Sequence, residues 1–218
     1  MIGTSLKTKH NIAVLWAILA AALYAISSPV SKILLKEISP TMMAALLYLG
    51  AGIGMSIVGF VRKKTGNAKK EMPLTKKELP FTIGMVLLDI AAPIFLMLGL
   101  SMTTAANASL LNNFEIVATS LIALFIFNEK IHNRLWLAVV LITLSSIILS
   151  IEDASSFSFS FGSLFVILAC ICWGFENNCT RMLSHKGPLK VVVIKGFGSG
   201  FGSLIIAFIL NQQTNNIK

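Results

Sequence analysis

Long uncharged segments are the feature that most constrains the fold of this chain. No Asp, Glu, Lys or Arg occurs in residues 11–31, 38–61, 90–114, 135–151, 154–175 and 196–217. A helix that crosses about 30 Å of hydrocarbon needs roughly 20 mostly apolar residues. Only helices and closed barrels satisfy their backbone hydrogen bonds in lipid, and these segments lack the period-two alternation of barrel strands. The sequence therefore predicts an all-α, polytopic membrane helix bundle.

Composition and charge support this interpretation. The chain is 56% hydrophobic and only 12% charged, whereas soluble domains carry about 25% charged residues. The formal net charge of +9 would suit a nucleic-acid-binding protein. However, the basic residues lie in short connections between apolar segments, which is typical of membrane proteins. We therefore expect the lipid bilayer as a partner and no nucleic acid.

Seven predicted spans give one consistent topology. We place them at 11–34, 40–61, 79–100, 104–127, 134–151, 161–182 and 188–211. Cytoplasmic loops carry an excess of Lys and Arg, so the lysine-rich connection 62–78 is predicted to be cytoplasmic, as is the N-terminus. The acidic connection 152–160 is then external. The expected location is the plasma membrane, with multiple passes.

The sequence contains an internal repeat. Tyr24 aligns with Trp173 and Pro40 with Pro188, and a set of glycines also aligns. These glycines are Gly50, Gly52 and Gly54 in the first copy and Gly198, Gly200 and Gly202 in the second. Five predicted spans separate the copies, and because five is odd, the second copy enters the membrane inverted. Inverted repeats of this kind form the two halves of many secondary transporters.

The two predicted repeats differ in completeness. The first repeat, residues 11–151, holds five transmembrane helices, whereas the second, residues 161–211, holds two. By symmetry three spans are missing from the second repeat. We therefore expect a C-terminally truncated or frameshifted product or a fragment, and the sequence does not distinguish these. It also leaves open whether such a chain works by pairing as a homo-oligomer.

Three segments carry a family resemblance. They are Ala105–Glu115 (AANASLLNNFE), Phe127–Lys130 (FNEK) and Trp173–Arg181 (WGFENNCTR). In their order and spacing they resemble the EamA-domain members of the drug/metabolite transporter superfamily. The resemblance implies two inverted five-helix repeats with both termini in the cytoplasm. It also implies a permease for amino acids, nucleotide sugars, drugs or other small metabolites, often an exporter. Asn128 departs from the family pattern, which usually has Gly before the Glu.

Asp89 is the first candidate for the substrate and ion pathway. It lies midway along the third span, one turn before Pro93. Proline removes a helix hydrogen bond and predicts a kink at this point. Ionisable groups inside membranes are costly and are functional hypotheses by default. Asp89 is thus either a cation or proton site, or a carboxyl group that is hydrogen-bonded to a neighbouring helix.

A second group of candidates lies on the fourth span. Asn112, Glu115 and Thr119 occur at helical spacing and are predicted to share one face. The alternatives are interhelical hydrogen bonding and a cavity lining, and the family resemblance favours the lining. Tyr24 and Trp173, which are related by the repeat, could stack on a substrate, although ordinary aromatic packing is the simpler interpretation.

A structural ion pair is predicted between Glu176 and Lys195. Each residue lies about 10 Å from the inner end of its span at ~1.5 Å per residue, so two consecutive antiparallel helices could bring them together. The three cysteines, Cys170, Cys172 and Cys179, share one predicted span without a histidine at zinc-site spacing. We therefore expect neither a metal site nor another cofactor.

Three functions compete at this point. The first is a secondary permease that works by alternating access. The second is a truncated membrane protein that does not transport. The third is a membrane-embedded enzyme, which the sequence disfavours because it lacks H-E-x-x-H, G-x-S-x-G and clustered aspartates. The substrate, the direction of transport and the coupling ion are not specified by the sequence.

Overall fold

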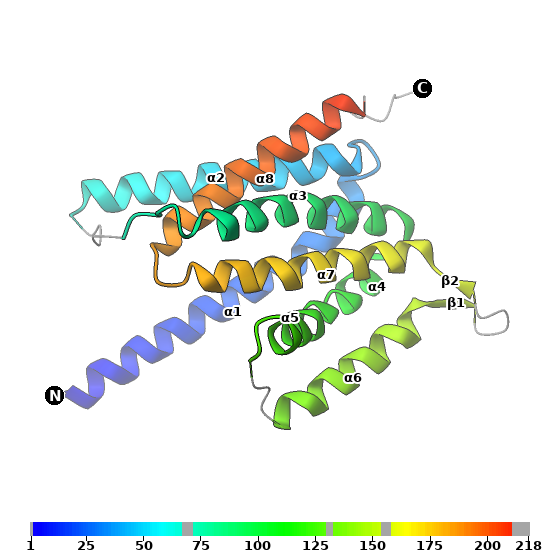
Figure 1. The fold of residues 1–218 in the computed structure, drawn as a ribbon, viewed down its shortest axis with the longest axis horizontal. Coiled ribbons are helices and arrows are strands. Elements are labelled where there is room, and N and C mark those ends of the chain that lie inside the picture. Colours follow the sequence, from blue (N-terminus) through cyan, green and yellow to red (C-terminus); the bar gives the residue numbers. More distant parts are fainter. Residues whose placement is uncertain (1, 67–71, 130–132, 154–157, 211–218) are drawn as a thin grey trace.

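The fold is a helix bundle, seen in a computed structural model of the 218-residue chain (Figure 1). The structure describes residues 2–66, 72–129, 133–153 and 158–210. The helices are α1 (Ile2–Leu34), α2 (Pro40–Lys64), α3 (Leu79–Met102), α4 (Ala105–Leu111), α5 (Phe114–Phe125), α6 (Asn133–Ser150), α7 (Phe161–Met182) and α8 (Pro188–Ile209). Six membrane-length apolar segments, with α4 and α5 counted together, and the shorter apolar part of α6 confirm the predicted bundle.

Polar residues define where several helices begin. Ser39 precedes α2, and its hydroxyl accepts a hydrogen bond from the backbone N–H of Met42. Thr104 and Ser160 act in the same way at the starts of α4 and α7. Such caps satisfy backbone donors that the first turn leaves unpaired. The sequence thus separates long apolar stretches into distinct spans.

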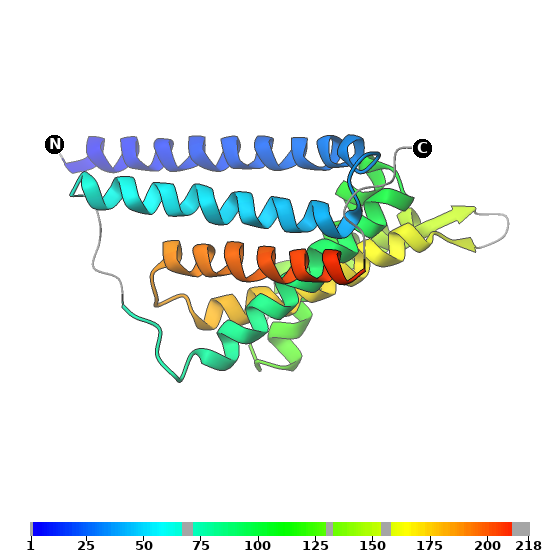
Figure 2. The same ribbon diagram turned by 90° about the horizontal axis from the view of Figure 1, so that it is seen from above.

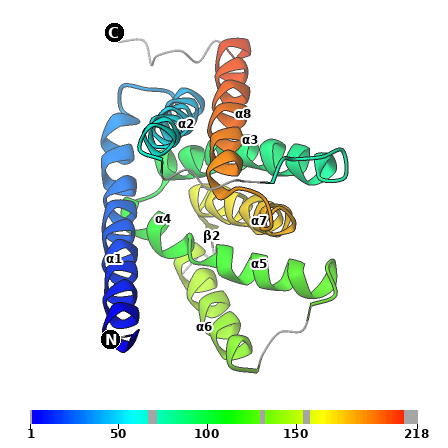
Figure 3. The ribbon, with the colours of Figure 1, turned by 90° about the vertical axis from the view of Figure 1, so that its left-hand side faces the viewer.

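Helix α7 lies at the centre of the bundle. It packs most extensively against α3 on one side and against α5 on the other, while α2 packs along α8 (Figures 1 and 3). Helix α1 lies at the edge and exposes large apolar side chains, among them Leu15, Trp16 and Leu23. Apolar faces of this extent are incompatible with water, so they are suited to lipid or to further helices.

Glycines on α8 serve two neighbouring helices. A Cβ atom added at Gly196 would lie 2.5 Å from the backbone nitrogen of Gly52, and one at Gly200 would lie 2.8 Å from that of Leu49, both on α2. Gly198 and Gly202 instead face the side chains of Val86 and Ile90 on α3. The two interleaved G-x-x-x-G patterns therefore let α8 approach both helices closely.

The fourth span differs from the prediction of one continuous helix over 104–127. The helix is interrupted at Asn112 and Asn113, between α4 and α5. The backbone N–H groups of Asn113, Glu115 and Ile116 donate to carbonyls three residues earlier, which tightens the turn. No such break occurs at Pro93, because α3 runs through it, and the predicted kink there stays a prediction.

The connection 152–160 also contains more order than expected. Strand β1 (Ile151–Asp153) pairs antiparallel with β2 (Ser158–Phe159) and forms a small hairpin beyond α6. This hairpin projects from one end of the bundle, whereas the C-terminal end of α2 and the α7–α8 connection lie at the other (Figure 2). The acidic and lysine-rich connections therefore leave opposite ends of the bundle.

Candidate functional site

Asp89 of α3 lies at the centre of a buried polar cluster. Its side chain is fully buried. The hydroxyl of Tyr48 on α2 donates to Oδ1 over 3.1 Å. The ammonium nitrogen of Lys195 on α8 lies 3.3 Å from Oδ2. Three helices thus bring polar atoms to one carboxyl group, and a charge at this depth is stable only with such partners.

Lys195 also contacts a second carboxyl group. Its Nζ lies 2.9 Å from Oε1 of Glu176 on α7. The hydroxyl of Thr180, one turn later on α7, donates to the same oxygen. The structure therefore brings the predicted partners Glu176 and Lys195 together, and it adds Asp89 as a third member. We refer to Asp89, Glu176 and Lys195 as the charge triad.

Trp173 is linked to the charge triad through Tyr48. Its indole Nε1 donates to the hydroxyl oxygen of Tyr48 over 3.4 Å. Tyr48 in turn donates to Asp89, so the three side chains form a chain of hydrogen bonds. The ring of Trp173 is half-buried. This contact gives Trp173 a partner for its N–H group, which a buried indole requires.

The predicted polar stripe on the fourth span faces α7. The amide Nδ2 of Asn177 donates to Oε1 of Glu115 over 2.7 Å and to Oγ1 of Thr119 over 3.1 Å. Glu115 and Thr119 therefore share one face of α5 and one partner. Asn177 lies next to Glu176 in α7, so the stripe adjoins the charge triad.

Asn112 lies at the interruption of the fourth span, between α7 and α1. Its Nδ2 donates to the hydroxyl oxygen of Tyr24 over 2.5 Å. On the other side, the thiol of Cys170 lies 3.6 Å from Oδ1 of Asn112. Tyr24 remains largely exposed, so this end of the polar network opens at the surface of the bundle.

The network contains more carboxyl groups than basic groups. Three carboxyl groups, those of Asp89, Glu115 and Glu176, lie close to the ammonium group of Lys195, and Glu115 lies within electrostatic range of both Glu176 and Lys195. An interior with this charge balance attracts cations and repels anions. It is built from five helices, α2, α3, α5, α7 and α8.

Charged contacts also join the helix ends away from this interior. Arg181 of α7 donates to Glu129, which follows α5. Glu78, just before α3, lies 3.3 Å from Nζ of Lys186 in the α7–α8 connection. Hydrogen bonds from the hydroxyl and backbone N–H of Thr75 lower the pKa of Glu78 to about 2, and Lys186 contributes to the same shift.

Comparison with known proteins identifies the family. The model of the EamA-like transporter family matches residues 11–151, which is more than half of the chain. The chain belongs to the EamA-like transporter family. The resemblance to this family is thereby confirmed.

A relative and a solved structure extend the comparison of this EamA-family chain. A protein of Methanothermobacter thermautotrophicus (strain Delta H), described as an uncharacterized transporter, is 30% identical over 213 residues. The match covers 90% of this chain and 61% of the relative, so the chain spans about six tenths of that curated protein. A solved crystal structure matches 87% of this chain and 67% of its own, with a TM-score of 0.57 and 16% identity. This likeness shows the fold alone.

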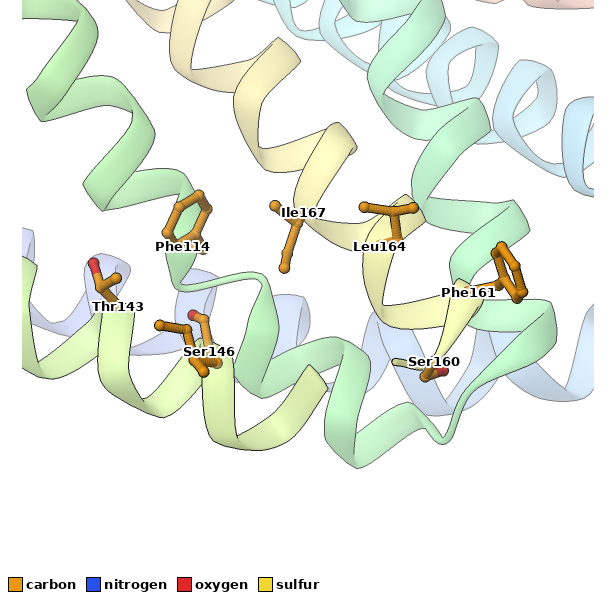
Figure 4. Close-up of a pocket in the computed structure, with 8 residues that line it drawn as sticks. Phe114, Thr143, Ser146, Ser160, Phe161, Leu164 and Ile167 are labelled. Atoms are coloured by element: carbon orange, nitrogen blue, oxygen red, sulfur yellow. The ribbon is translucent and has the colours of Figure 1, made fainter. Parts of the chain in front are cut away.

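A pocket of about 500 Å³ in this EamA-family protein lies away from the charge triad. It is formed mainly by α6 and the first turns of α7, with Phe114 at its upper edge in Figure 4. Among the described residues, its lining includes Thr143 and Ser146 but no ionisable side chain. Recognition of a charged group would therefore take place in the polar network and not in this pocket.

Several residues of the network were not predicted from the sequence. Tyr48 lies in an otherwise apolar stretch of α2, and only its contact with Asp89 reveals it. Asn177 and Thr180 lie in the family segment Trp173–Arg181, but neither was among the predicted site residues. A signal was available, since polar side chains in a membrane helix generally face a polar partner.

Proposed function

We propose that this protein is a secondary transporter that exports small metabolites, amino acids or drugs by alternating access. The observation that carries the proposal is the polar network inside a bundle of membrane helices, in which the charge triad adjoins the contacts of Asn177 with Glu115 and Thr119. Family membership supports the same function. A membrane protein without a polar solute has little reason to maintain so many costly groups in its interior.

Exposure divides the network into two parts with different roles. Asp89 and Glu176 are fully buried, whereas Glu115, Asn112 and Tyr24 are partly or largely exposed. We assign the accessible part to the solute, with Glu115, Thr119 and Asn112 as hydrogen-bonding groups. Tyr24 and Trp173 supply aromatic surface on either side of them. The excess of carboxyl groups favours neutral or cationic solutes over anionic ones.

The orientation of the protein follows from its charges. The basic residues near α2 and the α7–α8 connection favour the cytoplasmic side by the positive-inside rule. We therefore propose a plasma-membrane protein whose N-terminus lies in the cytoplasm. In this orientation the β1–β2 hairpin is external.

The proposal is tested by measuring solute flux. The purified protein is reconstituted in liposomes, and uptake is measured for a panel of labelled amines, amino acids and neutral metabolites. Glu115→Gln removes the charge of a side chain that we assign to hydrogen bonding with the solute. A hydrogen bond to a charged group is worth about 1.5–3 kcal/mol, so we expect flux to fall roughly 10- to 100-fold. Glu37→Gln is the matched control, since Glu37 is exposed between α1 and α2 and lies outside the network.

Two results would contradict the proposal. One is the absence of flux for every solute in the panel when the wild-type protein is correctly inserted. The other is equal loss of flux in the Glu37→Gln control, because the effect of Glu115→Gln would then not report on the network.

A further inference from the structure

The charge triad contains one carboxyl group more than its ammonium can neutralise. Lys195 lies between Asp89 and Glu176, at 3.3 and 2.9 Å. The side chains of both acids are at most 1% exposed. Burying a charge without compensation is very costly, and such a group neutralises instead. If both acids were ionised, the triad would hold one uncompensated negative charge.

The hydrogen bonds distinguish the two acids. Glu176 has the shorter contact with Lys195, and Thr180 donates to the same oxygen. Asp89 accepts from Tyr48 at Oδ1 only, and its buried Oδ2 has no hydrogen bond to any residue that the structure describes. Glu176 is therefore the better partner for the ammonium group. Protonation at Oδ2 of Asp89 gives up its 3.3 Å ion-pair contact with Lys195 but no hydrogen bond.

Three helices that pack on α3 place titratable groups near Asp89, and α1 places one farther along α3. Helix α2 contributes Tyr48, α8 contributes Lys195, and α7 contributes Glu176. Cys179, also on α7, faces Gly84 of α3, where an added Cβ atom would lie 3.3 Å from the cysteine sulfur. Helix α1 contributes Lys32, which donates to the carbonyls of Leu100 and Ser101 at the far end of α3. Lys195 is thus the cation next to Asp89 in the described part of the chain.

We infer that Asp89 binds and releases one proton, while Lys195 remains paired with Glu176. Uptake forms one O–H bond at Oδ2 with a proton from water, and release returns that proton to water. The O–H bond that breaks on uptake belongs to a hydronium ion, and it re-forms on release. When Asp89 is ionised, Lys195 is shared between the two carboxylates, so the state of Asp89 determines how tightly α8 is held to α3 and α7. That this step drives solute movement rests on the proposed function.

Infrared spectroscopy tests the proton site without any transport measurement. The chain has only two aspartates, Asp89 and Asp153, so isotopic labelling of aspartate carboxyl groups marks these two alone. We expect a label-shifted band of a protonated carboxyl group at neutral pH in the full-length protein in lipid nanodiscs. The Asp153→Asn control should keep this band, and Asp89→Asn should lose it.

Two further variants test the charge balance itself. In Glu176→Gln, Lys195 compensates Asp89, so the protonated aspartate band should disappear. In Lys195→Met, no cation remains, so the band should persist. The inference is overturned if the labelled wild type shows no such band, or if the band survives in Glu176→Gln. The wild-type spectrum is decisive even if a variant fails to fold.

The spectrum also separates this inference from the proposed function. A protonated Asp89 in a protein that moves no solute would refute transport and leave the proton site intact. Flux that depends on Glu115, measured in a protein whose Asp89 is ionised at neutral pH, would support transport and refute the proton site.

Discussion

At the scale of single residues, Lys195 is the side chain on which the interior most depends. It contacts carboxylates from two helices, and its own side chain is largely buried. A buried ion pair adds little stability compared with apolar side chains of similar volume, but removal of one partner leaves the other charge buried and uncompensated. Substitution of Lys195 alone therefore costs much more stability than the intact ion pairs add over apolar packing, which makes the site sensitive to substitution.

We predict that Lys195→Met lowers the free energy of unfolding by about 3–5 kcal/mol, because it leaves two buried acids without a cation. The double variant Lys195→Met/Glu176→Gln should recover much of this loss. Thermal unfolding of the purified variants in one detergent measures both effects. If the double variant is less stable than Lys195→Met alone, the two side chains do not act as a pair.

The sequence identified most of these residues because charge inside an apolar segment is conspicuous. Asp89, Glu115, Glu176 and Lys195 each stand out in that way, and helix depth alone predicted which two could meet. Tyr48 could not be predicted, because a tyrosine in a membrane helix is ordinary and its partner lies on another helix. The role of each candidate in a solute or ion pathway stays a prediction.

At the scale of elements, α8 illustrates how small residues determine packing. Its glycines alternate between α2 and α3, so the helix fits between two neighbours that larger side chains would push apart. The helix boundaries were predictable because apolar length and Ser/Thr caps define them. The interruption at Asn112 was not, since the residues there keep helical dihedral angles and differ only in their hydrogen bonds.

We predict opposite effects for two glycine-to-alanine changes at the α2–α8 region. Gly196→Ala places a methyl group against the backbone of Gly52, and overpacking of this kind costs about 1–3 kcal/mol. Gly50→Ala meets nothing within 4 Å and should stabilise α2 by roughly 0.5–1 kcal/mol. Unfolding midpoints of the two variants provide the comparison, and a neutral Gly196→Ala would show that the close approach is not needed.

At the scale of the whole molecule, the contacts between α2 and α8 agree with the aligned glycines. Gly52 contacts Gly196, and Leu49 contacts Gly200. In the repeat alignment Gly52 corresponds to Gly200, so the two contacts are approximately exchanged by the repeat. This supports an axis between α2 and α8, while the division into two inverted repeats stays a prediction.

Side-specific labelling tests the orientation of the whole chain. In sealed vesicles, a single cysteine placed in 62–78 and one placed in 152–160 should react with a membrane-impermeant reagent from opposite sides. A background in which Cys170, Cys172 and Cys179 are replaced by Ala supplies the control. Reaction of both positions from the same side would refute the predicted topology.

The charged contacts at the lysine-rich end have a further consequence. The side chains of Arg181 and Glu129 are 42% and 41% exposed, and an exposed pair contributes only about 0.2–1 kcal/mol. This ion pair therefore adds little to the packing of α7 against the end of α5, and ions in the surrounding water reduce its contribution further. The second pair at this end, Lys186 with Glu78, is largely buried, with side-chain exposures of 8% and 12%, so dissolved salt should weaken it much less than the Arg181–Glu129 pair.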